Sequence, residues 1–402
     1  MTSSELCSPK GRGPSLEVAD IFRRYGSQLG NLPMGHAKVV RDITQCRTEK
    51  LGGHVRECVT CGNRDQSYNS CRNRHCPKCQ ALARVRWVEN RARELLPVEY
   101  FHVVFTIPHE LNPLCLRNKA VLYNILFKAA SDTLKEVGRR RLDAQLGFVA
   151  ILHTWGQNLM DHPHLHFVVP GGGLKDDLTT WVPCKPGYLF PVKILSEVFR
   201  AKFLCLLEKS YDALVFPGKI QDLARPTRFK VLLKEASRKN WVTYAKKPFA
   251  GPEQVVEYLG QYTHRIAISN HRLINIEDGR VLFQYRAYAD HNKSKIMALT
   301  PKEFMRRFLL HVLPKRFVRL RHYGFLGNRL REMKLTACRK ILVPNEPSKQ
   351  QRSPQDDWKT LLLKRTGIDI NQCSLCQAAM REMASLPRLR YLPQRSNHPD
   401  TS

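Results

Sequence analysis

The sequence contains few acidic residues for its size. Its 402 residues include 35 Asp and Glu but 66 Lys and Arg, which leaves a formal net charge of +31 and a pI near 9.9. Solubility does not require so large an excess of positive charge, and such an excess is typical of proteins that bind a polyanion. The shortage of acidic side chains therefore predicts DNA as the main partner.

Long apolar runs are missing as well. No segment approaches the roughly 20 apolar residues that a membrane-spanning helix needs, and Met1–Pro14 lacks the apolar core of a secretory signal. We therefore expect a cytoplasmic protein with no membrane partner. The hydrophobic content of 43% still allows a sizeable core, divided between two or three domains.

Cysteine, by contrast, is abundant, and six of the 13 cysteines lie between Cys46 and Cys79. In a cytoplasmic chain such a cluster favours metal binding over disulfides. Two Cys-x2-Cys pairs in this cluster have the spacing of a four-thiolate zinc ribbon, because each pair can direct two sulfurs to one tetrahedral ion. The predicted ligands of this ribbon are Cys58, Cys61, Cys76 and Cys79. A mixed set interleaved with them is predicted to hold a second zinc ion: Cys46, His54, Cys71 and His75.

A further Cys-x2-Cys pair, Cys373 and Cys376, lies near the C-terminus. It has the spacing of half a zinc site, and no second half stands near it in the sequence. His322 and Cys338 are distant candidates for the missing ligands, and two ordinary thiols are the alternative.

A short histidine motif leads into an apolar strand. His164 and His166 alternate with Leu165, so on a strand both imidazoles point to one face and can bind one cation. If a hairpin turns near Asn158, His153 lies across from His164 and becomes the third ligand. Gln157 is the alternative third ligand. Magnesium or manganese is the expected ion, with zinc as the alternative.

Two tyrosines, Tyr258 and Tyr262, are spaced i, i+4 in a segment with helical character. This spacing places both phenols on one helix face, where each can act as a nucleophile once a cation or a base assists. Packing of the helix onto a sheet is the alternative explanation. The chain lacks the Gly-Lys-Ser/Thr loop of nucleotide-dependent enzymes, which agrees with a covalent phosphotyrosine that stores the energy of the cleaved bond.

Several cationic side chains lie beside these motifs and are expected to contact DNA phosphates. Some stand within the cysteine cluster, some follow the tyrosines, and some belong to a basic stretch further on. The predicted contacts are Arg72, Arg74, Lys78, Arg265, Arg272, Arg316 and Arg319.

Apolar spacing predicts an α+β fold. Strands are expected at 100–107, 148–155 and 164–169, and the run Thr300-Pro301-Lys302-Glu303 is a capping box that should begin a helix. We predict five regions: a helical segment at 1–40, a zinc-binding domain at 41–96, a catalytic domain at 97–290, a basic helical DNA-contact region at 291–345 and a polar C-terminal tail at 346–402.

Taken together, these motifs resemble the IS91-type insertion-sequence transposases. The resemblance runs from about Asp42 to Tyr323 and is carried by the runs Ser70–Gln80, Phe105–His109, His162–His166, Gly171–Gly173 and Tyr258–Tyr262. It implies a zinc-binding domain followed by an HUH endonuclease domain with a palm-like antiparallel sheet. It also implies His164 and His166 as the HUH ligands and Tyr258 and Tyr262 as paired nucleophiles.

The same resemblance implies rolling-circle transposition through single-stranded DNA ends and a 5′-phosphotyrosine, in a bacterial protein that associates with the nucleoid. The oligomeric state stays open, with a homo-oligomer as one option. A replication initiator or relaxase would use the same chemistry and is the first alternative. A zinc-dependent DNA-binding regulator without catalysis is the second, but it would leave the histidine strand and the tyrosine pair without a role.

Overall fold

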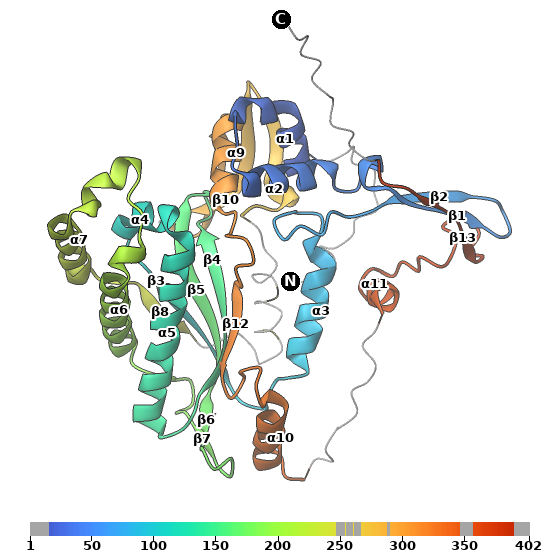
Figure 1. Cartoon of the computed structure of the whole chain (residues 1–402). Helices are drawn as coiled ribbons and strands as arrows, with labels where there is room; N and C mark the ends of the chain where they lie inside the picture. Colours follow the sequence, from blue (N-terminus) through green and yellow to red (C-terminus); the bar gives the residue numbers. More distant parts are fainter. Residues whose placement is uncertain are drawn as a thin grey trace, which may run out of the picture.

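A computed structural model describes residues 16–246, 267–287, 290–345 and 357–389, together with residues 254 and 260. Its largest sheet has five antiparallel strands in the order β12-β4-β5-β3-β8 (Figure 1). Their bounds are Leu320–Gly324 for β12, Gly147–Trp155 for β4, Asp161–Pro170 for β5, Tyr100–Thr106 for β3 and Thr243–Lys246 for β8. The sheet and its helices confirm the α+β class.

Helices cover one face of this sheet on the side of α5 and α6 (Figure 1). The inward side chains of the strands, such as Phe105, Phe148 and Phe167, form one buried cluster with apolar residues of these helices. Strand β3 is buried along its whole length because both of its faces are covered, which explains its almost continuous apolar sequence. The helices on this side are α4 (Asn112–Arg117), α5 (Lys119–Leu142), α6 (Val192–Lys209) and α7 (Pro226–Arg238), and a small hairpin of β6 (Gly172–Leu174) and β7 (Trp181–Pro183) lies at one end.

A second core joins the N-terminal helices to a three-stranded sheet and to α9 (Figure 1). The elements are α1 (Val18–Tyr25), α2 (Met34–Gln45), β9 (Leu273–Glu277), β10 (Arg280–Ala287), β11 (Lys293–Leu299) and α9 (Pro301–Leu310). Helix α9 begins as its capping box predicts, since the Thr300 hydroxyl accepts a hydrogen bond of 3.3 Å from the backbone N–H of Glu303.

The turn between β4 and β5 reaches into this second core. Leu159 at the turn is fully buried there. Two side chains hold the turn from the α9 side, since Arg307 Nη1 donates to the Asn158 carbonyl at 3.1 Å and His311 Nε2 donates to the Leu159 carbonyl at 3.0 Å. The hairpin therefore belongs to the large sheet along its strands and to the second core at its turn.

A third sheet combines an early hairpin with a strand near the C-terminal end of the described chain. Strand β1 (Gly53–Cys58) lies between β2 (Arg64–Tyr68) and the C-terminal β13 (Met380–Leu386). Gly52, directly before β1, has a φ of +67°, and a Cβ there would lie 2.3 Å from the Leu386 carbonyl oxygen, so only glycine fits this close approach. Further α-helices in the described ranges are α3 (Gln80–Ala92), α10 (Arg331–Leu342) and α11 (Trp358–Thr366).

Two predicted regions differ in content from the structure. The region 291–345, predicted to be helical, also contains β11 and β12, and β12 completes the edge of the large sheet beside β4. The tail at 346–402 contains α11 and β13. Isolated short stretches give weak periodic signals, and only their pairing partners establish them as strands. No helix within the described ranges is long and apolar enough to cross a membrane.

Candidate functional site

Three histidines converge on the face of the large sheet away from α5. The register of β4 and β5 places His153 directly opposite His164, as the hairpin argument predicts. His153, His164 and His166 each have one imidazole nitrogen placed toward the other two rings. These three nitrogens lie within 4.8 Å of one another. Gln157, the alternative ligand, lies in the turn between the strands, where its carbonyl accepts a hydrogen bond from Arg272.

Hydrogen bonds set the orientation of two of these rings. His164 Nδ1 lies 2.6 Å from the carbonyl oxygen of His162 and donates to it, which leaves the lone pair on Nε2. His166 Nδ1 lies 2.7 Å from His102 Nε2 on the neighbouring strand β3. When His166 donates in this pair, its Nε2 is likewise the atom with a lone pair for a ligand.

Burial keeps these imidazoles neutral. It lowers the pKa of His164 to about 3, lowers the pKa of His102 to about 4 and places the pKa of His166 well below the ordinary value. Neutral imidazoles have the lone pairs that a cation requires. Together with His153, His164 and His166 provide three nitrogen donors, which would suit a divalent cation and leave coordination positions for a phosphate oxygen and water, so the residues present fit the expected ion.

Sequence reasoning missed His102. This side chain lies on the largely apolar β3, and its contact with His166 depends on the pairing of strands whose two histidines are 64 residues apart in the chain. A single histidine inside an apolar strand was the available signal. His102 contacts His166, a predicted ligand, so its expected role is to position that ring.

Changing His102 to alanine is expected to weaken Mn²⁺ binding by about 10- to 100-fold, the range found when the partner of a metal-binding histidine is removed. Calorimetric titration with Mn²⁺ measures this. His102→Gln should restore most of the affinity, because its amide oxygen can accept from His166 Nδ1. Equal affinities for the wild type and His102→Ala would show that His102 only fills space.

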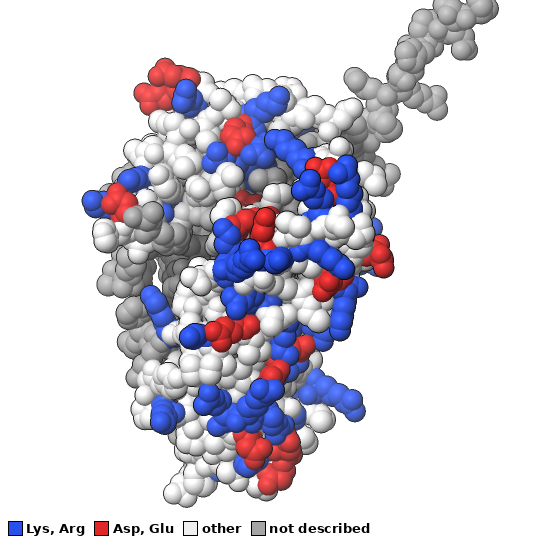
Figure 2. Space-filling model, turned by 90° about the vertical axis from the view of Figure 1, so that its left-hand side faces the viewer, with Lys and Arg blue, Asp and Glu red and all other residues white. Residues whose placement is uncertain are grey.

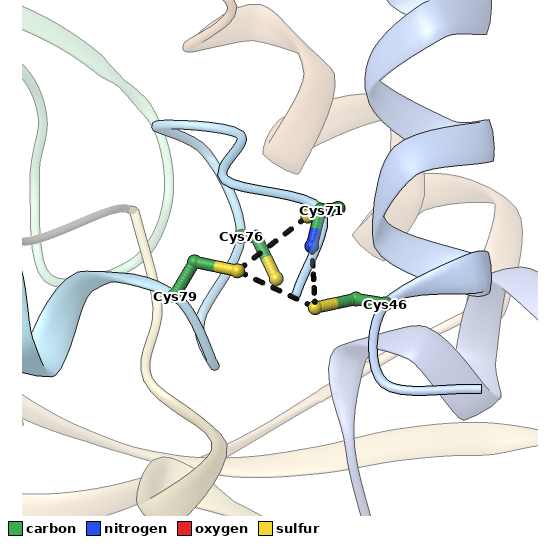
Figure 3. A group of neighbouring side chains, drawn as sticks. All are labelled: Cys46, Cys71, Cys76 and Cys79. Atoms are coloured by element: carbon green, nitrogen blue, oxygen red, sulfur yellow. Dashed lines mark hydrogen bonds between the residues drawn. The ribbon is translucent and has the colours of Figure 1, made fainter. Parts of the chain in front are cut away.

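Four cysteines meet beside the second core (Figure 3). Cys79 Sγ lies 3.4 Å from Cys46 Sγ and 3.6 Å from Cys71 Sγ, and Cys76 completes the group. Four thiolates around zinc at about 2.3 Å stand about 3.8 Å apart, so this arrangement approaches a tetrahedral site. Cys46 and Cys76 are fully buried in the cluster that contains α1, α2 and α9.

The structure corrects the predicted grouping of the zinc ligands. Cys58 and Cys61 do not meet Cys76 and Cys79, and instead form a second group of four with Cys373 and Cys376. The C-terminal pair thus supplies the half-site that the sequence left without a partner. Spacing within the cluster could not show this, because Cys61 and Cys373 are 312 residues apart in the chain.

Neither histidine of the predicted mixed site joins a cysteine group. His54 Nδ1 lies 2.9 Å from Glu382 Oε1 on β13, and the side chain is half exposed. His75 is buried, and burial lowers its pKa to about 3, but its ring belongs to none of the metal-ligand groups in the described part of the chain. Both groups therefore consist of cysteines alone.

The predicted DNA contacts fall into groups with different surroundings. Arg74 donates to the carbonyl oxygens of Phe317 and Pro314 at 2.6 and 3.1 Å, and Lys78 Nζ pairs with Glu17 at 2.6 Å. Arg272 donates to two backbone carbonyls, and burial lowers the pKa of Arg319 to about 10. Arg72 and Arg316 are exposed, whereas Arg265 lies outside the described residues.

Both tyrosines also lie outside the described residues, but Gly260 between them is described. It is helical and buried, and a Cβ at this position would come within 2.1 Å of Val88 Cγ2 on α3. Arg84, which also belongs to α3, lies next to Gly260, because the Arg84 Cγ would be 3.8 Å from a Cβ at residue 260. The midpoint of the Tyr-Leu-Gly-Gln-Tyr run is therefore packed against α3.

Positive charge dominates the face formed by α6 and α7 (Figure 2). Helix α7 carries four exposed cationic side chains and one acidic residue, Glu235. The cationic residues are Arg228, Lys230, Lys234 and Arg238. This face extends the positive charge far beyond the motifs and agrees with the net charge of +31.

Two family models match the chain. The model "Transposase zinc-binding domain" matches residues 18–107, and the model "Putative transposase" matches residues 147–334. A "Putative transposase y4qJ" of Sinorhizobium fredii is 48% identical over 368 residues, which cover 90% of this chain and 92% of that protein. The chain belongs to this transposase family. The "Transposase for insertion sequence element IS801" of Pseudomonas savastanoi pv. phaseolicola is 28% identical over 90% of the present transposase and 86% of its own length.

Among solved structures, the metal-bound conjugative relaxase TrwC in complex with OriT DNA is similar to 40% of the transposase. The match covers 70% of the relaxase chain at 16% sequence identity, with a TM-score of 0.24. A score this low supports no structural comparison. The family matches and the two cysteine groups support zinc as the ion of the N-terminal domain of the transposase.

Proposed function

We propose that this transposase nicks and rejoins single-stranded DNA at the ends of an insertion sequence, through a 5′-phosphotyrosine, during rolling-circle transposition. The observation that carries the proposal is the three-histidine group, in which His153, His164 and His166 converge on neighbouring central strands. Transposase relatives over nine-tenths of the chain support DNA as the substrate.

The neutral imidazoles would hold magnesium or manganese at this site. When bound there, the ion would polarise the scissile phosphate and offset the charge that develops on its oxygens. His162 and His102 serve this arrangement by fixing the rings of His164 and His166 through hydrogen bonds. The carbonyl and imidazole partners hold these rings in place before DNA arrives, which is the preorganisation that charge stabilisation requires.

The phenols of Tyr258 and Tyr262 would supply the nucleophiles. A phenol oxygen gives up its proton and attacks phosphorus, a bond forms between the tyrosine and the 5′-phosphate, and the bond to the 3′ oxygen breaks as that oxygen takes up a proton. In the rejoining step a 3′ hydroxyl attacks the phosphotyrosine and releases the phenol. Two tyrosines allow one to cleave the first DNA end while the other acts at the second end. The cationic Arg84 beside Gly260 would favour phosphate near this segment.

The test uses labelled single-stranded DNA from the element's ends, incubated with the full chain and Mg²⁺ or Mn²⁺. A denaturing gel detects a covalent adduct, and peptide mapping identifies the tyrosine. We expect adducts on Tyr258 or Tyr262, and joined products when two end sequences are present together. An adduct on another residue, or no adduct with verified ends in either metal, would refute the proposal. Cleavage without joining of two ends would instead favour an initiator or relaxase.

Exposed arginines are the proposed phosphate contacts of this substrate. Changing Arg72 and Arg316 to alanine should reduce the salt dependence of binding to single-stranded DNA, with the slope of log K against log salt falling by about one to two. Binding titrations at several salt concentrations measure the slope. An unchanged slope would place the DNA elsewhere.

Arg74→Ala is the contrasting variant, because Arg74 donates to backbone carbonyls inside the protein. Its loss leaves two acceptors without this donor, which costs about 1–3 kcal/mol. We therefore expect Arg74→Ala to lower the melting temperature and to leave the salt slope unchanged.

A further inference from the structure

The C-terminal segment of the described chain is built into the N-terminal hairpin. Strand β13 pairs antiparallel with β1 from Gly53 opposite Leu386 to Cys58 opposite Met380. Beyond the strands, the Val59 N–H donates to the Ala379 carbonyl at 3.1 Å, and Arg56 donates to the Ile370 carbonyl. These bonds bring Cys58 and Cys61 next to Cys373 and Cys376.

The two Cys-x2-Cys pairs adopt the same local structure, although Cys61 and Cys373 are 312 residues apart in the chain. In each, the first cysteine's N–H donates to the carbonyl five positions on, at 2.9 Å for Cys58 and 2.8 Å for Cys373. Its carbonyl accepts from the N–H four positions on, at 3.2 Å for Gly62 and 3.0 Å for Gln377. Gly62 and Gln377 both have a positive φ, of 68° and 62°, which few residues other than glycine adopt.

Backbone N–H groups also point at the first sulfur of each pair. Cys58 Sγ accepts from the N–H of Thr60 and of Cys61, each at 3.5 Å, and Cys373 Sγ accepts from the N–H of Leu375 at 3.4 Å. Donors of this kind favour thiolate over thiol, because they stabilise negative charge on sulfur. Each pair is therefore a loop that presents two sulfurs and favours the thiolate form at the first of them.

The sulfurs of the two loops face one another. Cys58 Sγ lies 3.3 Å from Cys376 Sγ, and Cys61 Sγ lies 3.7 Å from Cys373 Sγ and 3.4 Å from Cys376 Sγ. These separations approach the roughly 3.8 Å edge of a zinc tetrathiolate and exceed the disulfide bond length of about 2.05 Å. Four sulfur ligands without nitrogen or oxygen select a soft ion such as zinc.

We propose that Cys58, Cys61, Cys373 and Cys376 bind a second zinc ion, which joins residues 357–389 to the N-terminal hairpin as one split zinc-binding module. The matched zinc-binding family model ends at residue 107 and therefore contains only half of this site. The module needs the ion, because most side chains of β1, β2 and β13 are at least partly exposed and bury little apolar surface.

The test begins with metal content. Elemental analysis of the full chain should give two zinc ions per protein, and Cys373→Ser/Cys376→Ser should retain one. Cys205→Ser, which changes an exposed cysteine outside both groups, is the matched control and should retain two. One zinc in the wild type, or two in the double variant, would overturn the proposal.

Alkylation of the wild-type protein tests the same site without relying on a folded variant. Cys61 and Cys376 are exposed, as is Cys205, so without zinc all three should react with iodoacetamide. We expect zinc to protect Cys61 and Cys376 at least tenfold relative to Cys205, and a chelator to abolish the protection. Equal reaction of all three in the zinc-loaded protein, or a disulfide between the loops by mass spectrometry, would overturn the proposal. Neither result depends on DNA cleavage, so failure here is separate from failure of the proposed chemistry.

Discussion

Replacing His164 and His166 together by alanine is expected to abolish formation of the covalent DNA adduct. These side chains provide two of the three nitrogen donors in the histidine group, and His153 alone offers too few donors to retain Mg²⁺ or Mn²⁺. Loss of the ion removes the charge stabilisation of the phosphate, so the rate should fall on the order of 10³-fold or more. Single-turnover cleavage of labelled end DNA measures the rate, and calorimetry measures the ion affinity.

The matched control is His109→Ala, because His109 is also a histidine of this region but its side chain is 86% exposed. This variant should cleave DNA at the wild-type rate. Circular dichroism must show that the double variant is folded, since both rings stand within a sheet. Adduct formation at the wild-type rate by the folded double variant would show that the histidine group does not hold the catalytic ion.

The substitution Cys76→Ser is expected to release the zinc ion of the group formed by Cys46, Cys71, Cys76 and Cys79. It should also destabilise the whole N-terminal part of the transposase. Cys76 is 1% exposed and packs in the same core as α1, α2 and α9, so the loss of the ion reaches beyond the loop. Loss of a structural zinc ion costs roughly 5 kcal/mol or more of unfolding free energy. Denaturant unfolding with parallel zinc analysis measures both effects.

Cys205→Ser again provides the control and should change neither zinc content nor the unfolding free energy. The Cys76 variant should bind one zinc ion fewer than the control. Full zinc content together with unchanged stability would contradict the assignment of Cys76 as a ligand. Full zinc content with reduced stability would assign Cys76 to packing alone.

The histidine group shows that a sequence can predict which side chains meet when they belong to one hairpin. Strand parity places His164 and His166 on one face, and a hairpin turn of known position places His153 opposite His164, so the convergence of all three histidines follows from a single hairpin. His102 does not follow in this way. Its contact with His166 depends on which strand lies next to β5, and sequence spacing does not determine the strand order.

The cysteines show where spacing alone misleads. The spacing within each Cys-x2-Cys pair correctly predicts a loop with two converging sulfurs, because the local backbone determines it. The choice of partner loop depends on tertiary structure, and here β13 brings Cys373 and Cys376 to Cys58 and Cys61. Arg74 is a similar case, since composition cannot distinguish a guanidinium that binds carbonyls from one that faces DNA.

The buried turn at Leu159 has a consequence for how this transposase can be dissected. A fragment starting at residue 97 would retain every histidine of the metal group but would lose α1, α2 and the first cysteine group, which enclose the second core around that turn. Leu159 would then lose only part of its enclosure, because β9, β10 and α9 remain in such a fragment and Arg307 and His311 still donate to the turn. Exchange of N-terminal regions between related transposases would therefore require that the incoming α1 and α2 pack against the recipient's turn at the position of Leu159.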